Sequence, residues 1–176
     1  MSNNLILVEG QEGVGKSTIL RALLPHTPHA ARIDGEDLGQ LNPCTMDPDF
    51  MQLLWRNMAA LIKNFWDAGY STVVAGSSID SHSDYVLFRQ QLPSDVSVYL
   101  VHLCASKAVR DQRRIDRVGA STKEWRDWID NACPEDTTFQ ESQQDYRYVQ
   151  VRTDGLSIDD TLAVIKEAIP EIYADG

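Results

Sequence analysis

The sequence predicts an α/β fold in which layers of helices cover both faces of a central five-stranded parallel sheet. Short apolar runs alternate with helical patterns along the chain. The apolar residues of these runs are nearly continuous, as in strands that are buried on both faces of a parallel sheet. The 176 residues contain no internal repeat or long linker. This length suits one domain with a substantial core, so residues 1–176 are predicted to form a single domain.

The first half of the chain predicts three strands and two helices. Pro25 ends the first helix, and Gly69 suits the C-cap of the second. Apolar residues in the second helix have the spacing of one helix face, and Trp55, Arg56 and Asn57 fall outside that face. The predicted elements are a strand at 5–8, a helix at 15–24, a strand at 31–34, a helix at 49–68 and a strand at 71–75 that ends at Gly76.

The second half predicts two strands and three helices. Ser157 is a suitable N-cap for the last helix. The predicted elements are a strand at 96–103, helices at 106–117 and 121–131, a strand at 146–151 and a helix that begins after Ser157. Ligands of parallel α/β sheets bind outside the carboxyl ends of the strands. Functional residues are therefore expected just after each strand.

Composition and charge exclude several functional classes. Apolar residues make up 43% of the chain and charged residues 24%, which is typical of a globular protein. The net charge of −10 would repel nucleic acid and acidic membrane surfaces, so neither is an expected partner. No apolar run approaches the roughly 20 residues that span a bilayer, and the polar start "MSNN" is unlike a signal peptide. With three widely spaced cysteines, these features predict a cytoplasmic protein that is a monomer or a homodimer.

A glycine-rich loop follows the first strand. The segment from Gly10 to Ser17 matches G-x-x-x-x-G-K-[ST], the Walker A motif or P-loop, and lies between a strand and a helix as this motif requires. Its glycines let backbone N–H groups point inward, and the helix N-terminus adds partial positive charge. Lys16 is placed to reach the outer phosphates, and Ser17 to bind Mg²⁺. The predicted ATP-binding residues of this loop are Gly10, Gly13, Val14, Gly15, Lys16, Ser17 and Thr18.

The chain resembles the P-loop small-molecule and nucleotide kinases over most of residues 5–165. The stretch VEGQEGVGKST is similar to the opening of thymidylate kinases, and later segments such as RIDGEDLGQLNP and VYLVHLCASKAVRDQRRIDR look more like gluconate and shikimate kinases. The Asp-Arg pair that follows the third strand of thymidylate kinases is missing, and Gly39 replaces a histidine of gluconate kinases. The resemblance implies a P-loop NTPase fold of the nucleoside monophosphate kinase type that uses ATP and Mg²⁺.

Three acidic residues, Asp34, Glu36 and Asp37, follow the second predicted strand. A kinase needs one carboxylate near its magnesium ion and another that accepts or orients the proton of the attacking hydroxyl. Alternate residues at a strand end point the same way, so Asp34 and Glu36 are expected to face one pocket. By resemblance, Asp34 contributes to Mg²⁺ binding and Glu36 is the base, with Asp37 as a rival base on the substrate side. Capping of the next turn is the structural alternative.

The acceptor-binding region is expected at about residues 36–60 and at the end of the third strand. By resemblance to shikimate kinases, Arg56 would hold an acceptor carboxylate through a bidentate contact. A solvated surface arginine would have the same sequence signature. Gly76 permits a close backbone approach, and Ser77 and Ser78 offer hydroxyl donors to the acceptor.

Four arginines cluster on one side of the helix that follows the fourth strand. They are Arg110, Arg113, Arg114 and Arg117, at positions i, i+3, i+4 and i+7. By resemblance, Arg113 stacks on the nucleotide base, and Arg117 closes on the transferring phosphoryl group as part of a short lid at about residues 113–127. Ion pairs with nearby acids are the alternative for this face. Trp125 and Trp128 either pack in the core or form an aromatic wall for a ring-shaped acceptor.

The sequence therefore predicts an ATP- and Mg²⁺-dependent kinase that transfers the γ-phosphoryl group to an alcohol group of a small metabolite. A nucleoside or nucleoside monophosphate kinase is the first alternative, because of the thymidylate-kinase-like loop. An ATP-binding regulatory module with slow ATPase activity is the second. The paired acids and the lid arginines favour a kinase.

Overall fold

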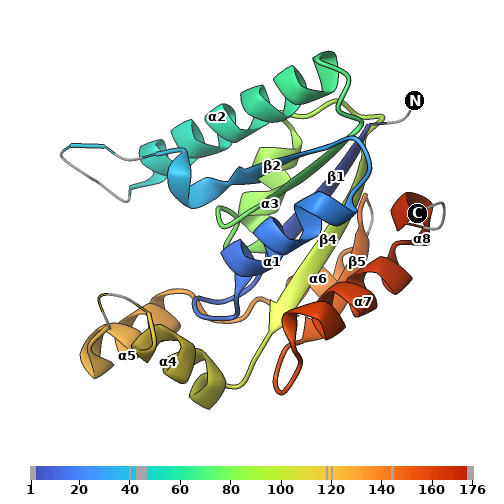
Figure 1. Cartoon of the computed structure of the whole chain (residues 1–176). Helices are drawn as coiled ribbons and strands as arrows, with labels where there is room; N and C mark the ends of the chain where they lie inside the picture. Colours follow the sequence, from blue (N-terminus) through green and yellow to red (C-terminus); the bar gives the residue numbers. More distant parts are fainter. Residues whose placement is uncertain are drawn as a thin grey trace.

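The structure is a computed structural model that describes residues 3–39, 41–42, 47–117, 119, 121–143 and 145–173. Five parallel strands form one sheet in the order β2-β3-β1-β4-β5, with helices on both of its faces (Figure 1). The predicted three-layer fold with a five-stranded parallel sheet is therefore confirmed. Gln40 and residues 43–46 of the predicted acceptor-binding region lie outside the described residues, as do Val118 and Ala120 of the predicted lid.

The strands follow the apolar runs of the sequence to within a residue or so. β1 is central, and Val8 is paired with Gly76 of β3 and with Val101 of β4. Because all pairs are parallel, the carboxyl ends of the strands meet at one edge of the sheet. The strands are β1 (Asn4–Glu9), β2 (Ala30–Asp34), β3 (Thr72–Gly76), β4 (Ser97–Cys104) and β5 (Arg147–Arg152).

One face of the sheet is covered by α2 (Pro48–Asp67) and α3 (His82–Arg89), and the short helix α6 (Thr138–Glu141) adds to the same core. Leu7 of β1 and Met58 of α2 are fully buried there. The apolar stripe of the long helix α2 thus packs on the sheet as its periodicity predicts.

Trp55 corrects one expectation for α2. Its side chain is only 3% exposed, and its indole N–H donates to the carbonyl oxygen of Ser78 at 2.9 Å. Trp55 is therefore a core residue with a satisfied polar end, whereas the neighbouring Arg56 is exposed. Periodicity alone does not reveal this, because the partner of the indole lies on a different element.

The opposite face is covered by α1 (Lys16–Leu23) and α7 (Ile158–Ala168). Ile6 of β1, Leu20 of α1 and Ile165 of α7 have no exposed surface in this second core. Successive residues of β1 thus alternate between the two cores, as the two-residue period of a strand requires. The P-loop begins where β1 leaves this sandwich.

Two helices, α4 (Lys107–Ile115) and α5 (Lys123–Ala132), lie together beside the P-loop end of the sheet (Figure 1). Thr122 caps α5 by accepting a hydrogen bond from the Trp125 backbone N–H at 3.2 Å. Trp125 is 42% exposed and Trp128 is 62% exposed. The alternative in which these two tryptophans pack in the core is therefore wrong.

Three short helical segments complete the described chain: η1 (Leu24–His26), η2 (Gly35–Asp37) and α8 (Pro170–Tyr173). η2 carries the acids that follow β2. None of the described helices is both long and apolar enough to cross a membrane.

Candidate active site

The loop between β1 and α1 depends on three glycines. Gly10, Gly13 and Gly15 have positive φ values of 140°, 87° and 105°, a region that disfavours residues with a Cβ. A Cβ on Gly10 would lie 2.3 Å from the carbonyl oxygen of Leu103, and one on Gly13 would lie 2.9 Å from that of Arg110. These two glycines seat the loop against β4 and α4, whereas the side of Gly15 is open.

Lys16 and Ser17 begin α1 at this open side of the loop. No described side chain caps the N-terminus of α1, so its first N–H groups are available to an anion. Lys16 Nζ donates to the carbonyl oxygens of Gly10 at 2.7 Å and Gln11 at 3.4 Å. The ammonium group is thus held against the loop, where a P-loop lysine meets phosphate.

A cavity of about 380 Å³, here called the lateral cavity, lies between α1, α4 and the start of α7. Arg113 lines it and donates to the carbonyl oxygen of Val14 at 2.8 Å and to Thr153 Oγ1 at 2.9 Å. These contacts fix the flat guanidinium group of Arg113 beside the P-loop. Its stacking on a nucleotide base stays a prediction. The other lining residues include Gly13, Gly15, Thr18, Asp116, Arg117 and Ser157.

A second cavity, of about 220 Å³, is enclosed by the P-loop, the ends of β1 and β3, η2 and the segment that links α5 to α6. We call it the acidic cavity, because six carboxylate side chains oppose a single cationic side chain, Lys16, among its described lining residues. The six acids are Glu9, Glu12, Glu36, Asp80, Glu135 and Asp136. The apolar wall is formed by Ile79, Trp125, Ile129, Pro134 and Phe139.

Glu36 is the predicted base that lines the acidic cavity together with Lys16. Burial raises its pKa above the usual value, and the charges of Asp34 and Glu12 raise it further. Lys16 and Arg117 oppose these effects. A base with a raised pKa is better matched to proton transfer near neutral pH, so the environment of Glu36 suits that role.

Three other predicted residues do not line the acidic cavity: Asp34, Asp37 and Arg56. Glu36 and Asp37, which follow β2, are both exposed, and so is Arg56 on α2. Because Glu36 lines the acidic cavity and Asp37 does not, the geometry favours Glu36 as the base, and it leaves Arg56 outside the site. Asp34 is 5% exposed. Its Oδ2 is 3.5 Å from an Arg32 nitrogen, and its Oδ1 has no partner in the described part of the chain.

Gly76, Ser77 and Ser78 are the predicted acceptor-binding residues at the end of β3. Of these three residues, only Ser77 lines the acidic cavity. A Cβ on Gly76 would lie 2.1 Å from the Val8 carbonyl oxygen, so this glycine serves the close pairing of β3 with β1. Ser78 Oγ contacts Met58 Sδ at 3.3 Å in the core. Ser77 lines the cavity with φ of 65°, and its buried Oγ has no partner among the described residues.

Sequence reasoning assigned no role to two buried ionisable residues of the acidic cavity, Glu9 and His102. Glu9 is 2% exposed and His102 is 4% exposed. Burial raises the pKa of Glu9 well above its usual value, and lowers the pKa of His102. The available signal was an ionisable side chain inside an apolar strand: Glu9 ends β1, and His102 lies within β4.

Two arginines of α4 join α4 and α5 to each other and to the P-loop. Arg110 and Arg114 are 5% and 2% exposed, and both donate to Asp130 Oδ1 of α5, at 2.6 and 2.7 Å. Arg114 also donates to the backbone carbonyl oxygen of Glu12 at 2.5 Å. Arg110 and Arg114 thus form ion pairs, but they are buried rather than solvated, and their shared partner is Asp130 of α5.

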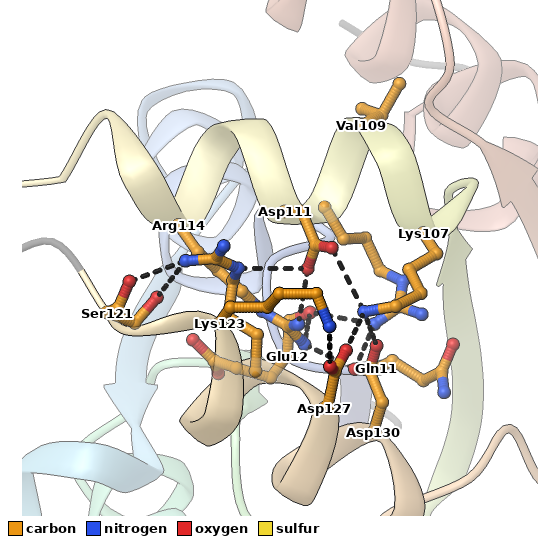
Figure 2. A network of polar contacts seen from close by, with 12 residues as sticks. Gln11, Glu12, Lys107, Val109, Asp111, Arg114, Ser121, Lys123, Asp127 and Asp130 are labelled. Atoms are coloured by element: carbon orange, nitrogen blue, oxygen red, sulfur yellow. Dashed lines mark hydrogen bonds and ion pairs between the residues drawn. The ribbon is translucent and has the colours of Figure 1, made fainter.

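Charged side chains also join α4 to α5 directly (Figure 2). Lys107 of α4 lies 3.0 Å from Asp111, 3.1 Å from Asp127 and 3.1 Å from Asp130. Because these contacts cross between the helices, α4 and α5 are expected to move as one unit.

Arg117 lies two residues beyond the end of α4, although the sequence predicts a helix that includes it, and its side chain reaches back to the P-loop. Its guanidinium group is 2.8 Å from Glu12 Oε1, and its side chain is 53% exposed. Exposed ion pairs contribute at most about 1 kcal/mol, so this contact is easily exchanged for another anion. Arg117 is thus accessible to a phosphate group while it remains beside the loop.

Solved structures share this fold at low sequence identity. A gluconokinase from Sinorhizobium meliloti 1021 superposes with a TM-score of 0.70 at 17% identity, covering 98% of this chain and 94% of that one. A sugar kinase from Janibacter sp. HTCC2649 gives a TM-score of 0.71 at 16% identity, covering 99% and 95%. A tunicamycin resistance protein from Deinococcus radiodurans gives 0.60 at 18%, covering 97% and 95%.

These likenesses establish a P-loop kinase-like fold, as the sequence motifs predict. No protein-family model matches the chain, and no curated protein matches its sequence.

Proposed function

We propose that this chain is a kinase that transfers the γ-phosphoryl group of ATP, with Mg²⁺, to a hydroxyl group of a small molecule. The observation that carries the proposal is the position of the P-loop between two cavities. The lateral cavity contains Arg113 and the acidic cavity contains Glu36. A nucleotide and an acceptor in these two cavities would meet at Lys16, as phosphoryl transfer requires.

The P-loop and α1 would bind the nucleotide. Inward N–H groups, the uncapped N-terminus of α1 and Lys16 are suited to the phosphates. Arg113 would stack on the base from the position that Val14 and Thr153 fix. Ser17 and Asp34 would help to hold Mg²⁺, which prefers oxygen ligands, and the unpartnered Oδ1 of Asp34 fits that role. When bound, the ion neutralises negative charge on the phosphates.

Glu36 and Arg117 would serve the transfer itself. Glu36 would accept the proton of the acceptor hydroxyl from its position in the wall of the acidic cavity. Arg117 would leave its exposed contact with Glu12 and stabilise the negative charge of the transferring group. The α4–α5 unit would act as the predicted lid that excludes water from this step.

The proposal is tested by measuring ADP release from Mg²⁺ and ATP in the presence of pooled hydroxyl compounds. We expect at least one pool to raise the rate by about tenfold or more over the ATP-only rate, as positioning of an acceptor should. Lys16→Met should abolish this stimulation, and Lys166→Met on α7 should leave it unchanged. ADP release that no pool stimulates would instead support a regulatory ATPase module.

Nucleosides and nucleoside monophosphates form a separate pool in the same assay. Stimulation by that pool alone would support the nucleotide-kinase alternative, which the similarity of the P-loop to thymidylate kinases motivates.

A further inference from the structure

The acidic cavity carries more negative charge than phosphoryl transfer requires. A kinase uses one carboxylate as the base, and Mg²⁺ typically takes one or two protein carboxylates. These roles occupy at most half of the six acids that line the cavity. Bound nucleotide would add negative charge and would engage Lys16, the single described cation of the lining. Of the remaining acids, Glu12 is paired with Arg117, and Glu135 lies 3.8 Å from His102 Nε2. The lining as a whole therefore holds more carboxyl groups than cations next to the phosphates.

Besides the Ser77 hydroxyl group, two further buried polar groups of the described lining have no partner. Glu9 Oε1 and His102 Nδ1 make no hydrogen bond in the described part of the chain, although their residues are 2% and 4% exposed. Both residues line the acidic cavity. Buried polar groups in proteins are nearly always hydrogen-bonded, so these two groups indicate a missing polar ligand. A carboxylate accepts hydrogen bonds, and an ammonium group donates three.

A transition metal is the other kind of cation with candidate ligands in this region, because His102, Cys104 and Glu135 have ligand atoms within 4.8 Å of one another. Cys104 does not line the acidic cavity, and burial raises the pKa of its thiol. The complete group of three therefore does not face the acidic cavity, and an organic cation is the better counter-ion for the acids that line it.

The apolar wall of the cavity is suited to a small organic cation. Trp125 and Phe139 face the same space as the acids, and aromatic faces attract cations. The volume of about 220 Å³ is below the range of roughly 300–1,000 Å³ typical of drug-sized ligands. The ligand is therefore small, on the scale of one ring or a short chain.

We propose that the acceptor is a small hydroxyl compound that carries a positively charged amino group, such as an amino alcohol, an amino sugar or an aminocyclitol. Its ammonium group would bind among Glu9, Asp80 and Glu135, while its hydroxyl group is presented to Glu36. A sugar acid or a nucleoside monophosphate would bring negative charge into the same space and would be repelled. This inference rests on the proposed kinase function and specifies the substrate class.

The test uses sets of compounds that are matched in skeleton and differ in charge. One set is glucosamine, glucose and gluconate, a second is 2-deoxystreptamine and myo-inositol, and a third is ethanolamine, ethylene glycol and glycolate. Calorimetry with Mg²⁺ and a non-hydrolysable ATP analogue gives Kd, and ADP release with ATP gives turnover. We expect the amine of at least one set to bind about tenfold tighter than its neutral partner, and tighter still than its anionic partner where the set has one.

Variants assign this preference to the acidic cavity. Glu135→Gln removes an exposed carboxylate of the lining without disturbing the core, and should reduce the preference for the amine by about fivefold or more. Glu9→Gln should do the same from the buried side. The matched control is Glu167→Gln, which makes the same change on the exposed side of α7 and should leave the preference unchanged. If Glu9→Gln fails to fold, Glu135→Gln decides.

The outcomes separate this inference from the proposed function. If neutral or anionic members stimulate ADP release and the amines do not, the kinase proposal stands and the cationic acceptor is overturned. If amines bind selectively but release no ADP, the cationic site stands and the kinase proposal fails. The absence of both selective binding and stimulated ADP release overturns both.

Discussion

At the scale of single residues, Glu36 is expected to control the chemical step. Glu36→Gln keeps the size of the side chain but removes the base, so kcat should fall by about 10²–10⁴-fold while the KM for ATP changes by no more than about twofold. Steady-state kinetics on the best acceptor measures both values. Asp37→Asn is the matched control, because Asp37 is exposed and outside the acidic cavity. An equal loss in Asp37→Asn would reassign the base.

The raised pKa of Glu36 also predicts a pH profile. A base acts in its deprotonated form, so kcat/KM should fall as the pH decreases through the pKa of Glu36. Because burial and neighbouring acids raise that pKa, the fall should begin above the usual glutamate value of about 4.3. In Glu36→Gln, the residual rate should lose this acidic limb, and a wild-type-like limb would contradict the assignment.

Substitution of Arg117 should affect catalysis far more than the stability of the fold. Its contact with Glu12 is largely exposed, so Arg117→Ala should reduce the free energy of unfolding by less than about 1 kcal/mol. If Arg117 stabilises the transferring phosphoryl group, the same variant should lower kcat by about 10³-fold. Urea unfolding and turnover, measured on one preparation, test both statements. A loss of stability without a loss of turnover would leave Arg117 with a purely structural role.

The buried carboxyl group of Glu9 should lower the free energy of unfolding of the chain. Burial raises its pKa in the folded chain, so the folded chain binds more protons than the unfolded chain between the two pKa values. The free energy of unfolding must then decrease as the pH rises through that interval. Glu9→Gln removes the buried charge and should raise the free energy of unfolding at pH 8 by about 1–3 kcal/mol.

Urea unfolding at pH 5 and pH 8 checks this prediction, with Glu167→Gln as the exposed control. The gain from Glu9→Gln should be smaller at the lower pH, where the Glu9 carboxyl is increasingly protonated. A destabilised Glu9→Gln variant at pH 8 would show that Glu9 has a partner or role that these contacts do not reveal.

At the scale of elements, Asp130 is the residue that joins the lid helices. Burial alone would raise its pKa, but hydrogen bonds from Arg114, Arg110 and Lys107 outweigh that effect and hold the pKa well below its usual value. Asp130→Asn would leave the buried guanidinium group of Arg110 without its carboxylate and that of Arg114 with Asp111 alone. It should destabilise the packing of α4 on α5 by about 3–5 kcal/mol, seen as faster amide hydrogen exchange in α5.

The matched control is Asp127→Asn on the same helix, whose side chain is 39% exposed and pairs with Lys107 and Lys123. Exposed pairs are worth less than about 1 kcal/mol, so exchange in α5 should change little. Because the pKa of Asp130 is lower in the folded chain than in the unfolded chain, its contribution to stability is complete above the unfolded value of about 3.9. The contribution should then be lost progressively as the pH falls from that value toward the pKa of the folded state.

The elements show what local sequence determines and what it does not. Continuous apolar runs and the P-loop motif identified all five strands and the loop after β1, because these signals lie within single segments. The acidic cavity has no such signal. Its acids come from β1, the P-loop, η2, the loop after β3 and the segment before α6. Only the strand order brings these segments together.

Individual side chains were misjudged for the same reason. Trp55 lies beside the apolar stripe of α2 but is buried because Ser78 offers its carbonyl oxygen. Ser77 and Ser78 are neighbours in the sequence, yet Ser77 lines the cavity and Ser78 contacts Met58 in the core. Each outcome depends on a partner that is distant in the sequence, which composition and periodicity do not identify.

At the scale of the whole molecule, nucleotide binding should stabilise the fold, because the P-loop joins the two cores. β1 contributes to both cores, and α4 is anchored to the loop through Arg114 and Glu12. A ligand at 100 times its Kd stabilises the folded state by about 2.7 kcal/mol. For a chain of this size, each kcal/mol raises Tm by roughly 2–4 °C. Mg²⁺ with ATP should therefore raise Tm by about 5–10 °C in thermal unfolding followed by circular dichroism.

The same experiment contains its own controls. Lys16→Met removes the ammonium group that meets the phosphates, so most of the shift should disappear, whereas Lys166→Met on α7 should retain it. AMP can occupy the lateral cavity between α1, α4 and α7 but lacks the outer phosphates that would contact the P-loop. AMP should therefore raise Tm by less than ATP does. Equal shifts for AMP and ATP, or a full shift in Lys16→Met, would place the nucleotide somewhere other than this loop.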